Sequence, residues 1–137
     1  MPRFFADTCY WMALLARRDP WHARVAAFSH TLMATEQIVT SDAVLTEVLA
    51  ALSAAGEHLR HEAVVLVDAL LHDAQVQVVE TSRGAFLEGV ALYRARPDKA
   101  YSLTDCISMQ VMRREGLADV LTNDHHFTQE GFHILFP

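Results

Sequence analysis

The stretch "SLTDCISMQVMRREGLADVLTND", residues 102–124, contains the pattern that decides the fold. Ser102 precedes a run of residues with helical apolar spacing, and Gly116 follows that run where a glycine commonly ends a helix. Residues 118–121 then form a short apolar segment typical of a strand, and Asp124 comes after it. The order of helix, glycine, strand and acid predicts an α/β unit with acids at the ends of its elements.

The rest of the chain alternates the same two patterns. We expect strands at residues 3–6, 37–40, 76–79, 118–121 and 132–136. We expect helices over residues 10–16, from the Asp19-Pro20 start signal through Leu32, from a Ser41 cap to Gly56, over 58–72, from a Thr81 or Ser82 cap to near Pro97, and over 103–115. Short strands separated by helices predict an α/β fold, with a short, mostly parallel central sheet covered by helices on both faces.

Length and composition indicate one folded domain, spanning residues 1–137. Hydrophobic residues make up 52% of the chain and charged residues 20%, which is enough apolar surface for a core. The apolar runs are far shorter than the roughly 20 residues that a membrane span needs. The N-terminus does not resemble a secretory signal, and the two cysteines have no CxxC neighbour, so we expect a cytoplasmic protein with reduced thiols.

The net charge limits how the chain can bind nucleic acid. Lys and Arg total 11 against 17 for Asp and Glu, which gives a formal charge of −6. This sign is opposite to that of proteins that bind nucleic acid through a broad basic face. Any contact with nucleic acid must therefore be local, bridged by cations or helped by a partner.

Two acids follow predicted strands directly. Asp7 comes after the strand at residues 3–6, and Asp124 comes after the strand at residues 118–121. Binding sites in parallel α/β sheets form outside the carboxyl ends of the strands, so this position favours a functional role. Asp is also a common turn residue because it bonds its own backbone. Both interpretations stay open for each acid taken alone.

Two further acids lie on predicted helices. Ser102 and Asp105 match the capping box, in which a hydroxyl and an acid three residues later satisfy free amides. Asp105 also adjoins the buried stripe of its helix, so it can serve a site at the edge of the core. Glu47 lies on a helix face with Val44 and Ala51, where small side chains leave space. An exposed helical Glu is the alternative interpretation.

The four acids together indicate a cation site. Carboxylates gathered at one place repel one another and raise one another's pKa values, unless a cation neutralises them. No Lys or Arg lies in the short sequence motifs that contain these four acids. Mg²⁺ and Mn²⁺ prefer carboxylate and water oxygens, so either is the natural partner.

The four motifs, in order, resemble those of the PIN-domain family. The motifs are "FADTCYW", "TSDAVLTEVLAAL", "SLTDCISM" and "LTNDHHF", and the resemblance extends from Arg3 to Phe136. It is strongest to VapC-like toxin ribonucleases and their stand-alone bacterial relatives. The resemblance implies a PIN-like α/β/α sandwich and a metal-dependent endoribonuclease. It also implies that one or two Mg²⁺ or Mn²⁺ ions are bound by the catalytic acids Asp7, Glu47, Asp105 and Asp124.

Residues beside the acids are candidates for supporting roles. The polar residues that flank the acids are Thr8, Ser102, Thr104 and Asn123, and they can position the carboxylates or the substrate. Roles as helix caps and turn residues are the alternative for this set. The basic residues Arg94, Arg96 and Lys99 precede Asp105 and can contact RNA phosphates. A solvated run of charges is the alternative for these three.

The resemblance also implies partners. A toxin of this family pairs with a small antitoxin protein, acts on RNA and commonly forms homodimers, without a membrane. Two other function classes are considered. One is a non-catalytic PIN-like scaffold that binds RNA or protein. The other is a phosphatase with Asp7 as nucleophile, although "DTC" lacks the second acid two residues later that this chemistry commonly uses.

The eight histidines do not form a zinc pattern. No HExxH motif occurs, and the pair His58 and His61 has no cysteine or further spaced histidine nearby. His125 and His126 follow Asp124 and are candidates for substrate contact. As sequence neighbours, these two side chains do not easily point into one site.

Overall fold

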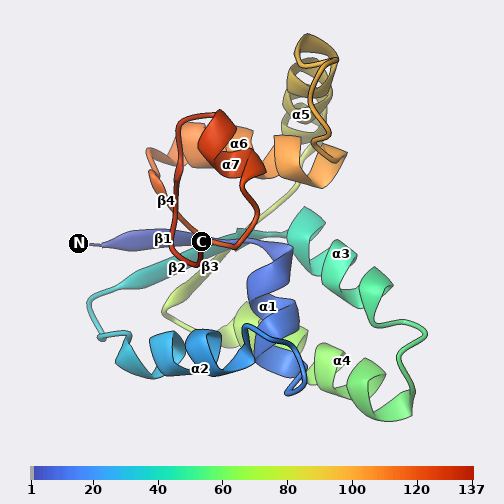
Figure 1. Ribbon diagram of the computed structural model, residues 1–137, viewed down its shortest axis with the longest axis vertical. Coiled ribbons are helices and arrows are strands. Elements are labelled where there is room, and N and C mark those ends of the chain that lie inside the picture. Colours follow the sequence, from blue (N-terminus) through green and yellow to red (C-terminus); the bar gives the residue numbers. More distant parts are fainter. Residues whose placement is uncertain (1) are drawn as a thin grey trace.

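The computed structural model describes residues 2–137 and contains a parallel β-sheet between two layers of helices (Figure 1). Its five strands are β1 (Arg3–Ala6), β2 (Gln37–Ser41), β3 (Val76–Val79), β4 (Asp119–Leu121) and β5 (His133–Ile134). Their order in the sheet is β3-β2-β1-β4-β5, and every neighbouring pair is parallel. This arrangement confirms the predicted α/β class.

Seven helices connect the strands within residues 2–137. They are α1 (Thr8–Leu15), α2 (His22–Thr31), α3 (Asp42–Ala51), α4 (Glu57–His72), α5 (Arg83–Ala95), α6 (Leu103–Glu115) and α7 (His126–Gln129). Helices α5, α6 and α7 lie on one side of the sheet, and α1, α2 and α4 lie on the other side (Figure 1). Helix α3 follows β2 and extends beyond the carboxyl ends of the strands. No helix among residues 2–137 is long and apolar enough to cross a membrane.

Local sequence signals set several helix ends as predicted. The side chains of Ser41 and Ser82 each accept a hydrogen bond from the amide three residues later, at the starts of α3 and α5. Ser102 and Asp105 form a complete capping box at the start of α6. Gly116 ends α6 in the left-handed conformation with φ of 69°, which a glycine adopts without a steric penalty.

Most predicted boundaries agree with the structure to within three residues, and the largest differences are at the end of α3 and in β5. Helix α3 ends at Ala51 rather than at Gly56, because the Ser53 hydroxyl donates to the Ala50 carbonyl and the chain turns there. The strand predicted over 132–136 contains only His133 and Ile134. The chain after β5 still forms a hydrogen bond with β4, from Leu135 N to Val120 O at 3.1 Å, but it does not continue as a regular strand. Helix α7 was not predicted.

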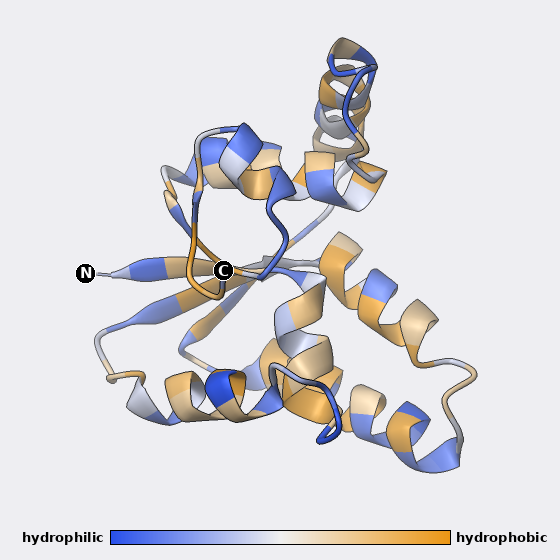
Figure 2. Ribbon diagram, in the orientation of Figure 1, coloured by the Kyte–Doolittle hydropathy of each residue, from blue (hydrophilic) through white to orange (hydrophobic). Residues whose placement is uncertain are grey.

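Two leucines on helices α3 and α4 are exposed. Leu49 on α3 is 37% exposed and Leu71 on α4 is 54% exposed, because each lies at the outer border of its helix stripe. The core itself forms around the central strands, where Phe5, Val39 and Val120 are fully buried. Apolar residues also predominate along α1 and α3 (Figure 2). This packing fixes the ends of β1, β2 and β4.

The order of the strands reverses direction beside β1. The connection through α1 and α2 leads from β1 to β2 on one side, and the connection through α5 and α6 leads to β4 on the other side. A crevice forms at such a switch in strand order, outside the carboxyl ends of the strands. Asp7 N donates to Leu121 O at 3.3 Å, so β1 and β4 end at the same level.

Candidate metal centre

Asp7 lies at the carboxyl end of β1 and is almost fully buried. Its side chain is 4% exposed, and its Oδ2 accepts a hydrogen bond from the Thr122 hydroxyl at 3.0 Å. Its Oδ1 is buried and has no hydrogen-bond partner among residues 2–137. A buried carboxylate oxygen without a partner is costly, and a cation ligand would remove that cost. Oδ1 therefore has the chemistry of a metal ligand.

Asp105 enters the same region from the first turn of α6. Its side chain is largely buried, and Oδ2 accepts a hydrogen bond from Ser102 N at 2.9 Å. The capping role therefore engages Oδ2 and leaves Oδ1 for another partner. Burial raises the pKa of Asp105, and the nearby charges of Asp124 and Glu47 raise it further, while hydrogen bonds from Ser102 act in the opposite direction.

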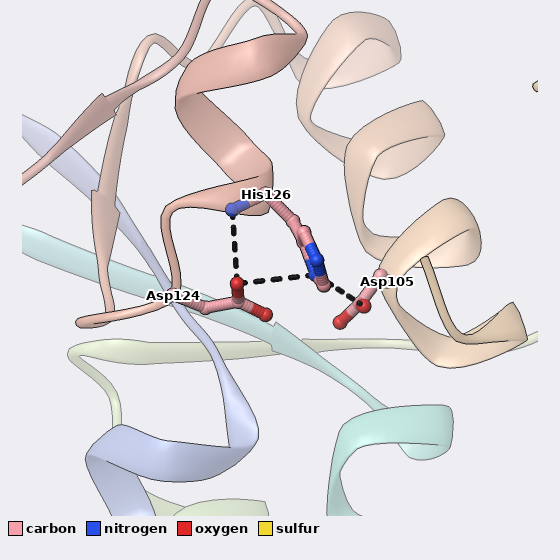
Figure 3. Close-up of side chains that lie close together, drawn as sticks. All are labelled: Asp105, Asp124 and His126. Carbon is pink, nitrogen blue, oxygen red and sulfur yellow. Dashed lines mark hydrogen bonds and ion pairs between the residues drawn. The ribbon is translucent and has the colours of Figure 1, made fainter. Parts of the chain in front are cut away.

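Asp124 and His126 complete a compact group with Asp105 (Figure 3). Each of the three offers one ligand atom, and these atoms lie within 4.8 Å of one another. Nδ1 of His126 is 3.2 Å from Asp124 Oδ1 and 3.8 Å from Asp105 Oδ2. Asp124 Oδ1 also accepts a hydrogen bond from His126 N at 2.9 Å. His126 is the first residue of α7. Neither Asp7 nor Glu47 belongs to this 4.8 Å group.

Glu47 lies at the border of the site. It is half-buried on α3, which packs against α6. Its charge raises the pKa of Asp105, so the two carboxylates are electrostatic neighbours. The structure thus brings Asp7, Asp105 and Asp124 together at the end of the sheet, with Glu47 on the neighbouring helix α3.

The electrostatics of Asp7 show how crowded the acids are. Burial raises its pKa to about 7, and the charge of Asp105 is the next largest cause. Asp124 raises the pKa further, while the backbone amide of Thr8 and the hydroxyl of Thr122 act in the opposite direction. At neutral pH the ionised form of Asp7 is therefore unfavourable unless a cation compensates its charge.

Thr122 is a site residue that sequence reasoning missed. Its hydroxyl donates to Asp7 Oδ2 at 3.0 Å and accepts a hydrogen bond from Asp124 N, also at 3.0 Å. One side chain thus holds the two acids that end β1 and β4. Its position directly after a buried strand, two residues before an acid, is the one signal in the sequence that points to it.

The predicted flanking residues differ in their contacts. Ser102 caps α6, as described above. Thr8 lies after Asp7, and its buried hydroxyl has no partner among the described residues. Asn123 lines a small cavity beside Cys9 and Thr122. Thr104 is half-buried in the first turn of α6.

The three predicted phosphate contacts are not equally free. Arg96 donates to Glu130 with Nε at 3.0 Å and Nη2 at 3.2 Å, and the Glu130 side chain is only 5% exposed. Lys99 lies 3.9 Å from the exposed Asp98. Arg94 is exposed at the end of α5. Arg96 is therefore engaged within the protein, whereas Arg94 and Lys99 face solvent.

Cys9 does not provide a nucleophile at this site. Burial and the charge of Asp7 raise the pKa of its thiol to about 11. Its Sγ lies 3.0 Å from the Thr122 hydroxyl. The thiol therefore stays protonated at neutral pH.

Comparison with known proteins places this geometry in context. The PIN domain profile matches residues 4–132. A search of curated proteins finds no match. Among solved structures, VapC20 from Mycobacterium tuberculosis, described as a sarcin-ricin loop cleaving toxin, is 25% identical with a TM-score of 0.85, and the alignment covers 98% of this chain and 99% of that one.

More distant structures share the fold. FitAcB from Neisseria gonorrhoeae is 14% identical with a TM-score of 0.69, over 96% of each chain. VapBC2 from Rickettsia felis, bound to a DNA fragment from its promoter, is 12% identical with a TM-score of 0.66, over 97% of each chain. At these identities the similarity describes the arrangement of helices and strands.

Proposed function

Because the PIN domain match covers residues 4–132, this chain belongs to the PIN-domain family, and we propose that it is a metal-dependent endoribonuclease. One observation carries this function: Asp7, Asp105 and Asp124 converge at the ends of β1, β4 and α6, and a buried oxygen of Asp7 has no partner in the described chain. Such a group of acids favours a divalent cation.

The residues fit one or two Mg²⁺ or Mn²⁺ ions. Asp7 Oδ1 would bind directly, and Asp105 and Asp124 each have one oxygen outside the hydrogen bonds described above. Glu47 would complete the acidic set from α3. When bound, a divalent cation activates water as a nucleophile and neutralises charge on the scissile phosphate and the leaving oxygen.

The other residues would hold the acids and the RNA. Thr122 fixes the orientation of Asp7, and the capping box fixes that of Asp105. Thr8, Thr104 and Asn123 are placed to support the acids or the substrate. Arg94 and Lys99 would contact RNA phosphates locally, which agrees with the overall charge of −6. Because Arg96 pairs with Glu130, its role would be to hold the loop between α5 and α6.

The similarity to VapC20 supports a toxin of a toxin-antitoxin pair, acting in the cytoplasm. It also makes the sarcin-ricin loop the first structured RNA to test. A small antitoxin protein and a second copy of this chain are the partners that we propose. No observation favours a phosphatase or a non-catalytic scaffold, since the four expected acids are all present.

The test is RNA cleavage by purified protein. A sarcin-ricin loop RNA and a single-stranded RNA are each incubated with Mg²⁺ or Mn²⁺, with EDTA as a control. The variants are Asp7→Asn and Asp105→Asn, with Asp68→Asn on the exposed face of α4 as the matched control. We expect cleavage that needs metal, is lost in both site variants and is kept in the control. Equal cleavage by all four proteins would refute the assignment, and RNA binding without cleavage would favour the scaffold.

A further inference from the structure

We propose that His126 is a nitrogen ligand of the metal centre, and that the centre therefore binds Mn²⁺ more tightly than Mg²⁺. This inference rests on the cation site of the proposed function and names a donor that the four acidic motifs do not include. It concerns which ion the site selects, so it can fail while the proposed function holds.

The position of the imidazole carries the first step. Nδ1 of His126 points between two carboxylates, 3.2 Å from Asp124 Oδ1 and 3.8 Å from Asp105 Oδ2 (Figure 3). This nitrogen is buried and makes no hydrogen bond with good geometry among residues 2–137. A buried ring nitrogen without a hydrogen bond is unusual unless it binds something, and its place between the two carboxylates suits a cation that their other oxygens also bind.

The ring is held in this position from outside the acidic group. The Tyr101 ring packs against the His126 ring edge to face, with centroids 5.4 Å apart. The Tyr101 hydroxyl donates to Glu130 Oε2 at 2.9 Å, and Glu130 also binds Arg96 and Arg113. These contacts do not involve the carboxylates of the metal site. They therefore set the orientation of the imidazole independently of a bound ion. Fixed ligands lower the cost of assembling a metal site.

A second buried atom of the site also lacks a hydrogen-bond partner among residues 2–137. Oδ1 of Asp7 also lacks a partner in the described part of the chain, and Asp7 is 4% exposed. Asp7 and Asp124 follow neighbouring strands and share the Thr122 hydroxyl. The Thr122 hydroxyl thus links Asp7, whose Oδ1 has no partner in the described chain, to Asp124, whose Oδ1 lies 3.2 Å from His126 Nδ1, and this fits a mixed oxygen and nitrogen donor set.

The donor set determines the preferred ion. Mg²⁺ binds oxygen ligands and keeps several waters, whereas imidazole suits first-row transition metals. Mn²⁺ accepts both carboxylate oxygen and imidazole nitrogen. A site of three or four carboxylates alone would discriminate little between the two ions, so a preference for Mn²⁺ depends on His126.

The experiment measures ion binding without RNA. Metal-free wild-type protein is titrated with Mn²⁺ and with Mg²⁺ by calorimetry, and the Mn²⁺ complex is examined by electron spin echo spectroscopy for coupling to ¹⁴N. The variants are His126→Gln and, as the matched control, His125→Gln. Circular dichroism and a thermal melt check that each variant is folded.

We expect ¹⁴N coupling in wild type and in His125→Gln, and none in His126→Gln. We expect the Kd for Mn²⁺ to rise about 10-fold or more in His126→Gln, while that for Mg²⁺ changes less than about threefold. Wild-type Mn²⁺ without ¹⁴N coupling would overturn this inference, even if His126→Gln does not fold. Coupling that persists in folded His126→Gln would also overturn it. No binding of either ion would contradict the proposed function as well.

Discussion

Replacing Asp7 with Asn should stabilise the metal-free protein while it removes activity. Burial and the charge of Asp105 raise the pKa of Asp7 from 3.8 to about 7. At about 1.4 kcal/mol per pKa unit, this difference corresponds to roughly 4 kcal/mol of unfavourable free energy in the folded state when Asp7 is ionised. Asn carries no charge and has nearly the same shape, so the variant avoids this cost.

The sign of the pH dependence follows from the raised pKa. The folded state binds the Asp7 proton more tightly than the unfolded state, so the stability of wild type falls as pH rises from about 3.8 to about 7. The advantage of Asp7→Asn should therefore be largest at pH 8. It should shrink to about half or less at pH 5, where most of the folded wild type is already protonated.

The assay is urea unfolding in EDTA at pH 8 and at pH 5. We expect Asp7→Asn to exceed wild type by about 2–4 kcal/mol at pH 8, with the upper figure set by the pKa change. Adding Mn²⁺ should reverse the order, because an ion that binds only the folded state stabilises the protein that holds it. A variant less stable than wild type at pH 8 in EDTA would refute the reasoning.

Three further substitutions test the framework around the site. In Gly89→Ala, the new Cβ would lie 2.5 Å from Ile107 Cγ1, so α5 and α6 must separate, and we expect a loss of about 1–3 kcal/mol in urea unfolding. Gly84→Ala is the control that should lose none, because its Cβ would meet only Ser82 Oγ, at an ordinary contact distance of 3.7 Å. Ser102→Ala removes the cap of α6 and should cost about 1 kcal/mol, measured the same way, and no change would contradict the capping role. Although burial alone would raise it, hydrogen bonds hold the pKa of Glu130 at about 2, so the stability that wild type gains over Glu130→Gln should be present above pH 4.5 and vanish as pH falls toward 2; a difference that is constant with pH would refute this.

Local signals made much of the fold predictable. The capping box of Ser102 and Asp105 and the glycine at 116 predicted both ends of α6, which the structure has at Leu103 and Glu115. The spacing of apolar residues and the residue types at the ends were sufficient for α6, because residues nearby in sequence make the hydrogen bonds that its terminal backbone groups need. The end of α3 was not predictable, since it depends on the Ser53 hydroxyl reaching a free carbonyl rather than on Gly56.

The site was predictable only in part, for a different reason. Asp7 and Asp124 follow strands, and that position alone indicates the carboxyl edge of a parallel sheet. Thr122 bonds to Asp7 across 115 residues, and His126 gains its partners from α6 and Tyr101. No pattern along the chain reports such contacts. They depend on the β1 and β4 pairing, which only the folded structure provides.

The most direct test of the metal centre is diffraction from crystals soaked in Mn²⁺, recorded where manganese scatters anomalously. We predict an anomalous peak in contact with the carboxylates of Asp7, Asp105 and Asp124, at the end of β1 and β4. An ion bound elsewhere, or no peak at a Mn²⁺ concentration that supports RNA cleavage, would contradict the account.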